Sequence, residues 1–274
     1  GTYHCADAAD DLRASLDTMF EVMSAAQLTE ELAELEPDFL YVPLDVLAED
    51  PGSIEPFLRR GATVAAVMPR VIHDGELRGV AALLQKARTA GVTQALVGNL
   101  GHVGIARAAG LDLRGDWSLN LFNSYSLQIA AKAGLLSAAV SFELNMEQIR
   151  QLSKPLDTEI IAYGRLPAML TGRCLIKASA GRCACGAPAR MSDEYGGVYP
   201  VLREYVCRNA VYGPAKVFLG DRLDDVKKAG VRGARLLFTN EGPRECVEVA
   251  KSFLGLSGYR PNGLTRGLYY RGVE

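Results

Sequence analysis

The sequence lacks several features that would place it in a common class of protein at once. Among its 274 residues there are three histidines and no HExxH motif, so a conventional zinc protease site is hard to build. Neither a GxSxG nucleophile elbow nor a GxGxxG dinucleotide fingerprint occurs. No apolar run approaches the roughly 18 residues that a membrane-spanning helix needs. The net charge of −2 gives no global basic excess that would indicate nucleic acid.

A secretory signal is also missing, and this decides how the six cysteines are interpreted. Residues 1–5 lack the basic-then-apolar layout of a signal peptide, and the sequence begins without Met, so we expect that it starts at a cut. The chain is long and 49% hydrophobic, unlike the small secreted domains that need disulfides. We therefore expect a cytoplasmic protein with reduced thiols that are available for metal.

Short apolar runs alternate with helical patterns along most of the chain. This alternation recurs every 20–30 residues, which is typical of βα units with a buried parallel sheet. It predicts an α/β fold, a (β/α)8 TIM-like barrel that is incomplete at its N-terminus, with a doubly wound sheet as the alternative. We expect one barrel domain over residues 1–274. The predicted strands are 38–44, 63–68, 94–97, 117–120, 138–141, 158–162 and 234–239.

Residues 164–215 interrupt the pattern and form a Cys-rich segment within the barrel. The segment is rich in Gly, Pro and Arg, and we expect it to be irregular and held by a covalent or metal constraint. It contains four of the six cysteines, Cys174, Cys183, Cys185 and Cys207. Four thiolates suit tetrahedral zinc or a [4Fe–4S] cluster, whereas buried inert thiols are the alternative. The sequence therefore predicts one shared metal site on these four cysteines.

Several stretches together resemble the collagenase-like peptidase family U32. The most specific are residues 159–169 (EIIAYGRLPAM), continued by residues 171–176 (TGRCLI), and the tail at 265–274 (TRGLYYRGVE). Residues 117–123 (WSLNLFN) and 141–144 (SFEL) resemble two further segments of the family. The resemblance extends from about residue 38 to the end.

The resemblance implies a TIM-like barrel whose cysteines carry a [4Fe–4S] cluster. Members were first described as peptidases, and others hydroxylate ubiquinone precursors or bases of tRNA and rRNA. Cys174 and Cys207 match family cysteines, but Pro167 stands where the family has another. Cys183 and Cys185 would then both have to serve as ligands, and zinc stays open as the alternative to iron and sulfur.

Polar residues at the ends of predicted strands are candidate catalytic groups, because barrels place their reactive groups there. We single out Asn120, Glu143, Tyr163 and Arg165: Glu143 as an acid or base and Arg165 as an anion clamp. Helix capping is the alternative explanation for such residues. The further candidates are Asn99, Asn240 and Glu241.

Three functions remain open from the sequence. The leading hypothesis is an iron–sulfur enzyme that hydroxylates RNA or a small aromatic molecule, and the others are a peptidase and a non-catalytic module with structural zinc. The Cys-rich segment is locally basic, which suits RNA or the compensation of thiolate charge in equal measure. RNA, a small molecule and a peptide are thus the candidate substrates. No membrane partner is indicated, and the sequence does not predict an oligomeric state.

Overall fold

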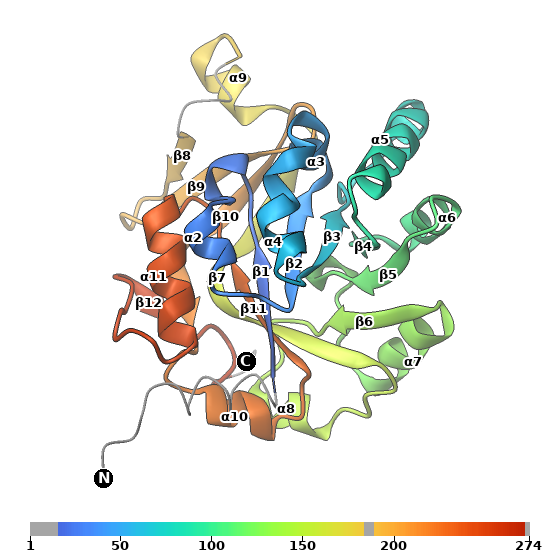
Figure 1. Ribbon diagram of the computed structural model, residues 1–274. Coiled ribbons are helices and arrows are strands. Elements are labelled where there is room, and N and C mark those ends of the chain that lie inside the picture. The colour runs from blue at the N-terminus through green and yellow to red at the C-terminus, as the bar shows by residue number, and fades with distance from the viewer. Residues whose placement is uncertain (1–15, 184–188, 272–274) are drawn as a thin grey trace.

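Eight parallel strands form a closed barrel, as the sequence predicts. The computed structural model describes residues 16–183 and 189–271. Each barrel strand pairs in parallel with its neighbours, and β11 pairs with both β1 and β7, which closes the ring (Figure 1). The strands are β1 (Asp17–Glu21), β2 (Phe39–Pro43), β3 (Thr63–Val67), β4 (Gln94–Val97), β5 (Asp112–Gly115), β6 (Leu135–Ala139), β7 (Asp157–Thr171) and β11 (Gly233–Leu237).

The expectation of a missing first strand is wrong, because β1 supplies it. β1 pairs with β11 and with β2, and all five of its residues are buried. Its sequence, DTMFE, has only two apolar side chains, next to each other, and begins and ends with a carboxylate. Because of these carboxylates the segment is not an apolar run, so the sequence did not indicate a strand there.

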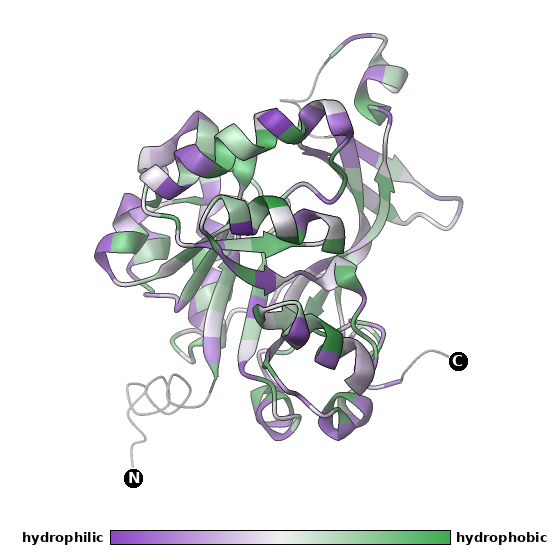
Figure 2. Cartoon of the chain, turned by 90° about the vertical axis from the view of Figure 1, so that its right-hand side faces the viewer, coloured by the Kyte–Doolittle hydropathy of each residue, from purple (hydrophilic) through white to green (hydrophobic). Residues whose placement is uncertain are grey.

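The helices lie around the outside of the barrel. Helix α5 (Leu77–Thr89) buries Val80, Leu84 and Ala87, which share one face at helical spacing. Most helices carry both hydrophobic and hydrophilic segments, as helices packed on one face do (Figure 2). The others around the barrel are α2 (Glu30–Ala33), α3 (Leu44–Glu49), α4 (Glu55–Arg59), α6 (Val103–Ala108), α7 (Ser124–Lys132), α8 (Met146–Gln151), α10 (Leu223–Lys228) and α11 (Pro243–Phe253). In the described part of the chain, no helix has the length and apolarity to cross a membrane.

The Cys-rich segment is largely regular, contrary to expectation. The second half of β7 pairs antiparallel with β10 (Arg208–Phe218), which pairs with β9 (Val198–Glu204), and β9 pairs with β8 (Ala189–Ser192). We call this sheet the extension; it carries the short helix α9 (Leu175–Ala180) at its far end (Figure 1). A two-residue strand, β12 (Leu264–Thr265), also pairs with β10. Register shifts between β7 and β10 interrupt the alternation of side chains, which hides the regular structure of the extension from its sequence.

The strand predicted at residues 117–120 is also wrong. The strand is β5, which ends at Gly115, and Trp117–Leu119 is a 3-10 helix, η5. A Cβ at Gly115 would lie 2.8 Å from the Cβ of Ala138, so glycine permits the close approach of β6. The chain then turns sharply, and Asn120 adopts a left-handed φ of 48°. The turn places Asp116 and Trp117 at the carboxyl end of the barrel.

Candidate functional site

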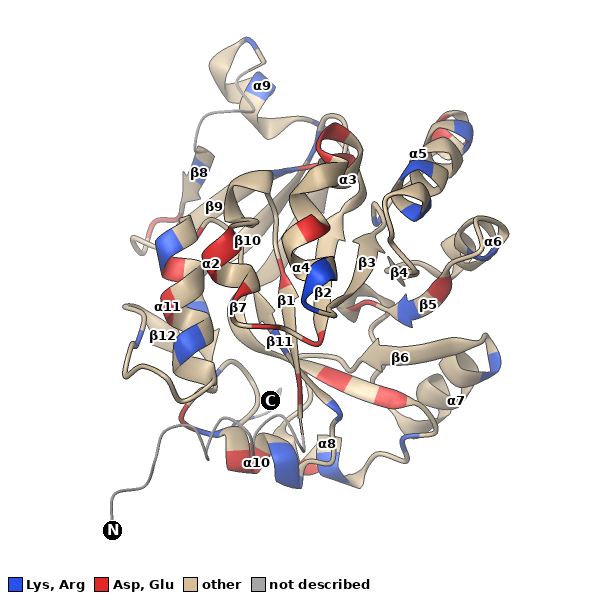
Figure 3. Ribbon diagram, in the orientation of Figure 1, with Lys and Arg blue, Asp and Glu red and all other residues tan. Residues whose placement is uncertain are grey.

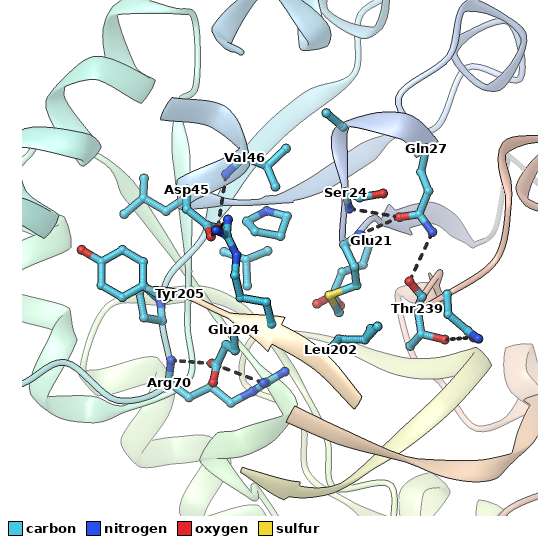
Figure 4. A pocket seen from close by; sticks show the side chains of 18 of the residues that line it. Glu21, Ser24, Gln27, Asp45, Val46, Arg70, Leu202, Glu204, Tyr205 and Thr239 are labelled. Atoms are coloured by element: carbon cyan, nitrogen blue, oxygen red, sulfur yellow. Dashed lines mark hydrogen bonds and ion pairs between the residues drawn. The ribbon is translucent and has the colours of Figure 1, made fainter. Parts of the chain in front are cut away.

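A cavity of about 750 Å³ lies at the carboxyl ends of β1, β2, β3 and β11. Glu21 lines it from the end of β1, Arg70 from the loop after β3, and Glu241 from the loop after β11. Glu204 and Tyr212 come from β9 and β10, so the extension forms one wall (Figure 4). The carboxyl end of the strands is where barrel enzymes carry their active sites.

Glu21 is the cavity residue with the most unusual environment. Its side chain is fully buried, and its Oε2 atom accepts a hydrogen bond of 2.9 Å from Arg235 Nη1. Its Oε1 atom has no hydrogen-bond partner among the described residues. Burial raises the pKa of Glu21 to about 7, an effect that nearby Arg235 only partly offsets and that Asp116 reinforces. A carboxyl group with this pKa is suited to accept and return a proton near neutral pH.

Arg235 holds Glu21 in place from inside the barrel. Its guanidinium is fully buried and also binds Asp116 Oδ1 (Nη1, 2.6 Å) and Glu159 Oε2 (Nε, 3.0 Å). Tyr41 donates to Glu159 at 3.1 Å and accepts a hydrogen bond from Arg114 Nε at 2.7 Å. The barrel interior is therefore filled by a network of charges as well as by apolar layers. Because Arg235 is itself held by three carboxylates, it fixes the position of Glu21.

Arg70 forms a second polar group in the cavity, with Glu204 and Trp117. Its backbone N donates to Glu204 Oε1 at 3.1 Å and its Nη1 does so at 3.4 Å (Figure 4). The guanidinium carbon lies 4.3 Å from the centre of the Trp117 ring, which is a cation–π contact. Burial lowers the pKa of Arg70, but Tyr212 and Glu204 raise it more, so the group stays charged. Arg70 Nε and Glu204 Oε2 have no hydrogen-bond partner among the described residues.

Asn120 and Glu143 lie outside the cavity lining. Both are exposed and follow η5 and β6, near the carboxyl end of the barrel. The backbone N of Glu143 donates to Ser141 Oγ at 3.3 Å. Asn99, a further candidate, caps a 3-10 helix by accepting a hydrogen bond from Gly101 N at 2.9 Å, as the capping alternative expects. The proposed roles of Asn120 and Glu143 stay predictions.

Tyr163 points away from the cavity because of an irregularity in β7. The register with β11 shifts between Arg235 and Leu236, which turns Tyr163 towards the helices, where it packs on Phe238 and Phe253. Its hydroxyl donates to Glu241 Oε1 at 3.1 Å. A bulge of this kind reverses which side chains face inward, and no pattern in the sequence indicates it.

Arg165 lies further along β7, at the extension. Its Nη1 donates to the backbone oxygens of Gly213 and Pro214, which lie in the bulged part of β10. It lines a second, more open hollow beside Lys216 and Tyr259. Arg165 and Tyr163 therefore do not share the cavity of Glu21, whereas the candidates Asn240 and Glu241 do line it.

Cys174 and Cys207 lie on two segments that meet at the far end of the extension. Cys174 caps α9, its sulfur accepting a hydrogen bond from Lys177 N at 3.3 Å. Leu175 N donates to Asn209 Oδ1 at 2.7 Å, which joins the start of α9 to the start of β10, just after Cys207. Both Cys207 and Cys183 are exposed.

The described donors do not fit a four-cysteine metal site as they are arranged. Within residues 16–183 and 189–271, no three His, Cys, Asp or Glu side chains could together hold a metal ion. Cys185 lies outside the described residues. The [4Fe–4S] cluster and the alternative zinc ion therefore stay predictions.

Sequence reasoning missed Glu21, Arg70, Asp116, Glu204 and Arg235. Glu21 ends β1, which the sequence did not predict, and Arg235 lies within the predicted strand 234–239, where no role was assigned to it. A charge in the middle of an apolar strand was the available signal, since such a side chain is buried only when it is paired. Arg70 and Glu204 are in contact although they lie 134 residues apart in the sequence, and no local pattern predicts that contact.

The fold and the cavity define a (β/α)8 barrel with a charged site at the carboxyl ends of its strands. The chain belongs to peptidase family U32, whose family model matches residues 52–193, more than half of its length. A solved structure described as "Native KDPGal structure" aligns over 88% of this chain and 94% of its own, at 11% identity and a TM-score of 0.51. That likeness supports the barrel fold alone.

Two curated proteins are similar over part of their length. One is the 23S rRNA 5-hydroxycytidine C2501 synthase of Escherichia coli (strain K12), which is 24% identical over 162 residues, 55% of this chain and 25% of that protein. The other is the uncharacterized protease MJ0090 of Methanocaldococcus jannaschii, 25% identical over 151 residues, 49% of this chain and 37% of that protein. The matches thus span between a quarter and somewhat over a third of these relatives.

Proposed function

We propose that the chain is an enzyme that modifies a base of RNA in the cavity, with Glu21 as the acid–base group. The observation that carries this proposal is the buried Glu21 carboxylate, which faces the cavity with Oε1 unpartnered among the described residues. Its pKa of about 7 lets it take a proton from a bound ring and return it. The similarity to an rRNA hydroxycytidine synthase supports a base as the substrate.

Arg70 and Glu204 are suited to hold the edge of such a base. Arg70 Nε offers a donor and Glu204 Oε2 an acceptor, and both atoms lack other partners among the described residues. Ring edges of bases present donors and acceptors side by side, and their faces stack on guanidinium planes. The cavity volume of about 750 Å³ is in the range of small-molecule sites. In this scheme Arg70 and Glu204 orient the ring and Glu21 moves the proton.

Asp116 and Arg235 act on the reaction through Glu21. Arg235 Nη1 bridges Glu21 and Asp116 at 2.9 and 2.6 Å, so the carboxylate cannot turn away from the cavity. The positive charge also keeps the pKa of Glu21 from rising further. Hydroxylation is the form of modification that we favour.

The test is to replace the chromosomal gene by variants and to analyse the nucleosides of total RNA by mass spectrometry. Cells with the wild-type chain or with Glu55→Gln, an exposed control on α4, should contain a nucleoside carrying one additional oxygen atom. Glu21→Gln keeps the size of the side chain but cannot exchange the proton, and that nucleoside should be lost. Identical nucleosides in all strains would refute the proposal. Loss with Glu143→Gln alone would support the acid or base predicted from the sequence.

The two alternatives give different results. A peptidase with Glu21 as the base would release peptides from denatured collagen and lose this activity with Glu21→Gln. A non-catalytic module with structural zinc predicts a barrel mouth filled by side chains, and the cavity argues against it. Iron and sulfide analysis after anaerobic purification tests the predicted cluster on Cys174, Cys183, Cys185 and Cys207. Stoichiometric zinc without iron would favour the zinc alternative.

A further inference from the structure

Positive charge is concentrated in one continuous part of the chain. Residues 160–192 contain five Lys and Arg residues and no Asp or Glu, although the whole chain has a net charge of −2. The stretch forms the outer half of β7, helix α9 and strand β8. Figure 3 shows blue and no red on α9 and β8. The charge of the extension is therefore opposite in sign to that of the whole chain.

Four of these five cations are available for a partner. Arg165 is engaged by the backbone oxygens of Gly213 and Pro214. The other four are exposed and make no ion pair within the described residues. We call them the basic face: Arg173, Lys177, Arg182 and Arg190.

Asp193, the first carboxylate after the basic face, is engaged within its own turn. Asp193 accepts hydrogen bonds from Tyr199 Oη at 2.8 Å and from Gly197 N at 2.7 Å in the turn between β8 and β9. These contacts lower the pKa of Asp193, so the groups of the turn stabilise its negative charge. Arg203 and Arg208, by contrast, are paired with the carboxylates of Asp45 and Glu76 on the barrel side. The cations that face the barrel are thus matched, and those that face outward are not.

The basic face reaches the cavity wall at Arg190. Arg190 of β8 pairs with Pro200 of β9, and Leu202, two residues further along β9 and therefore on the same face of the sheet, lines the cavity. Neighbouring strands lie about 4.8 Å apart, so a bound chain can pass from β8 over β9 to the cavity. Exposed Met191 (44%) and Tyr195 (88%) provide apolar surface beside the charges. Such a mixture of cations and rings suits single-stranded nucleic acid.

We propose that the basic face binds the phosphate backbone of an RNA strand whose target base enters the cavity. The inference rests on the proposed function for the identity of the strand, and its own basis is the charge complementarity of the extension. A protein that neutralises phosphates with Lys and Arg releases counterions, so binding weakens in a defined way with salt. The basic face would thus contribute affinity without sequence preference, and Arg70 and Glu204 would select the base.

The test is fluorescence anisotropy with a labelled single-stranded RNA of mixed sequence, at several KCl concentrations, using the whole chain. One variant replaces the four basic-face residues by Gln. The matched control replaces four exposed cations on other helices by Gln, at Arg78, Lys86, Lys132 and Lys228. All positions are exposed, and circular dichroism checks that both variants are folded.

We expect the basic-face variant to raise Kd at least about tenfold near 0.1 M salt, while the control stays within about twofold. The slope of log Kd against log salt should fall by about 0.7 for each phosphate contact that is lost. Equal weakening of both variants, or none in either, would overturn the proposal. So would binding to phosphatidylserine-containing vesicles through these residues with no binding to RNA. RNA binding that needs the basic face, without any modified base, would refute the proposed function and leave this inference standing.

Discussion

Arg235 engages one oxygen of the Glu21 carboxylate and leaves the other without a hydrogen-bond partner among the described residues. In most buried carboxylates both oxygens are satisfied, because an unpaired buried acceptor costs roughly 1–3 kcal/mol. Here the same guanidinium also binds Asp116 and Glu159, so three carboxylates share one positive charge. The arrangement keeps Glu21 close to neutral and directed at the cavity.

The first prediction concerns the pH dependence of stability. Burial raises the pKa of Glu21 from 4.5 to about 7, so the folded chain retains a proton that the unfolded chain has lost. Stability from this group is full below about pH 4.5 and falls as the pH rises to 7, by on the order of 3 kcal/mol. Urea unfolding of the wild type and Glu21→Gln should show this loss in the wild type alone. A parallel pH dependence in both, with Glu55→Gln as control, would contradict the assignment.

The second prediction concerns Arg235. Replacement by Met removes the charge that Glu21, Asp116 and Glu159 share and leaves them buried together. We expect the free energy of unfolding to fall by about 3–5 kcal/mol. Arg150→Met, in an exposed pair with Glu147, should leave it nearly unchanged. Urea denaturation measures both, and equal effects would show that the interior network does not support the barrel.

The third prediction concerns the coupling of Arg70 and Glu204 across the cavity. A double-mutant cycle with Arg70→Gln and Glu204→Gln should give a coupling energy on the order of 1–3 kcal/mol, because both side chains are largely buried. Trp117 is the one tryptophan of the sequence and lies against Arg70, so its fluorescence follows unfolding and the state of this pair. A coupling energy no larger than that of the exposed Arg150–Glu147 pair would mean that this ion pair does not hold β9 against the loop after β3.

The fourth prediction concerns thiol reactivity. Cys246 is buried on α11, and desolvation raises the pKa of its thiol to about 12. At pH 8 about 10⁻⁴ of such a thiol is ionised, whereas Cys207 is exposed. Brief treatment of the native chain with iodoacetamide, followed by peptide mass mapping, should therefore label Cys207 and spare Cys246 until the protein is unfolded. Labelling of native Cys246 would indicate that α11 opens readily.

The sequence predicted the barrel well and its charged interior poorly. Helix α5 follows from its helical periodicity, and strands β2 to β4 follow from short apolar runs, because the strands of a parallel barrel are buried on both faces. β1 escaped notice because Glu21 ends it, and Glu21 is tolerable there because Arg235 faces it from a strand 214 residues away. Tyr163 was predicted from its place at the end of a strand, and the irregularity in β7 turns it away from the cavity. Periodicity reports local packing, whereas the site depends on pairings between distant segments.

Strand β7 belongs to both sheets, since it pairs with β11 in the barrel and with β10 in the extension. At Gly164, where the two sheets meet, a Cβ would lie 2.2 Å from the backbone oxygen of Leu237, and φ is +123°. A glycine there lets the strand continue without a break from the barrel to Thr171, a span of about 26 Å from Tyr163 at 3.3 Å per residue. The length of β7 therefore sets the distance between the cavity and α9. In the proposed RNA complex, this distance would decide how many nucleotides separate the selected base from those bound at α9.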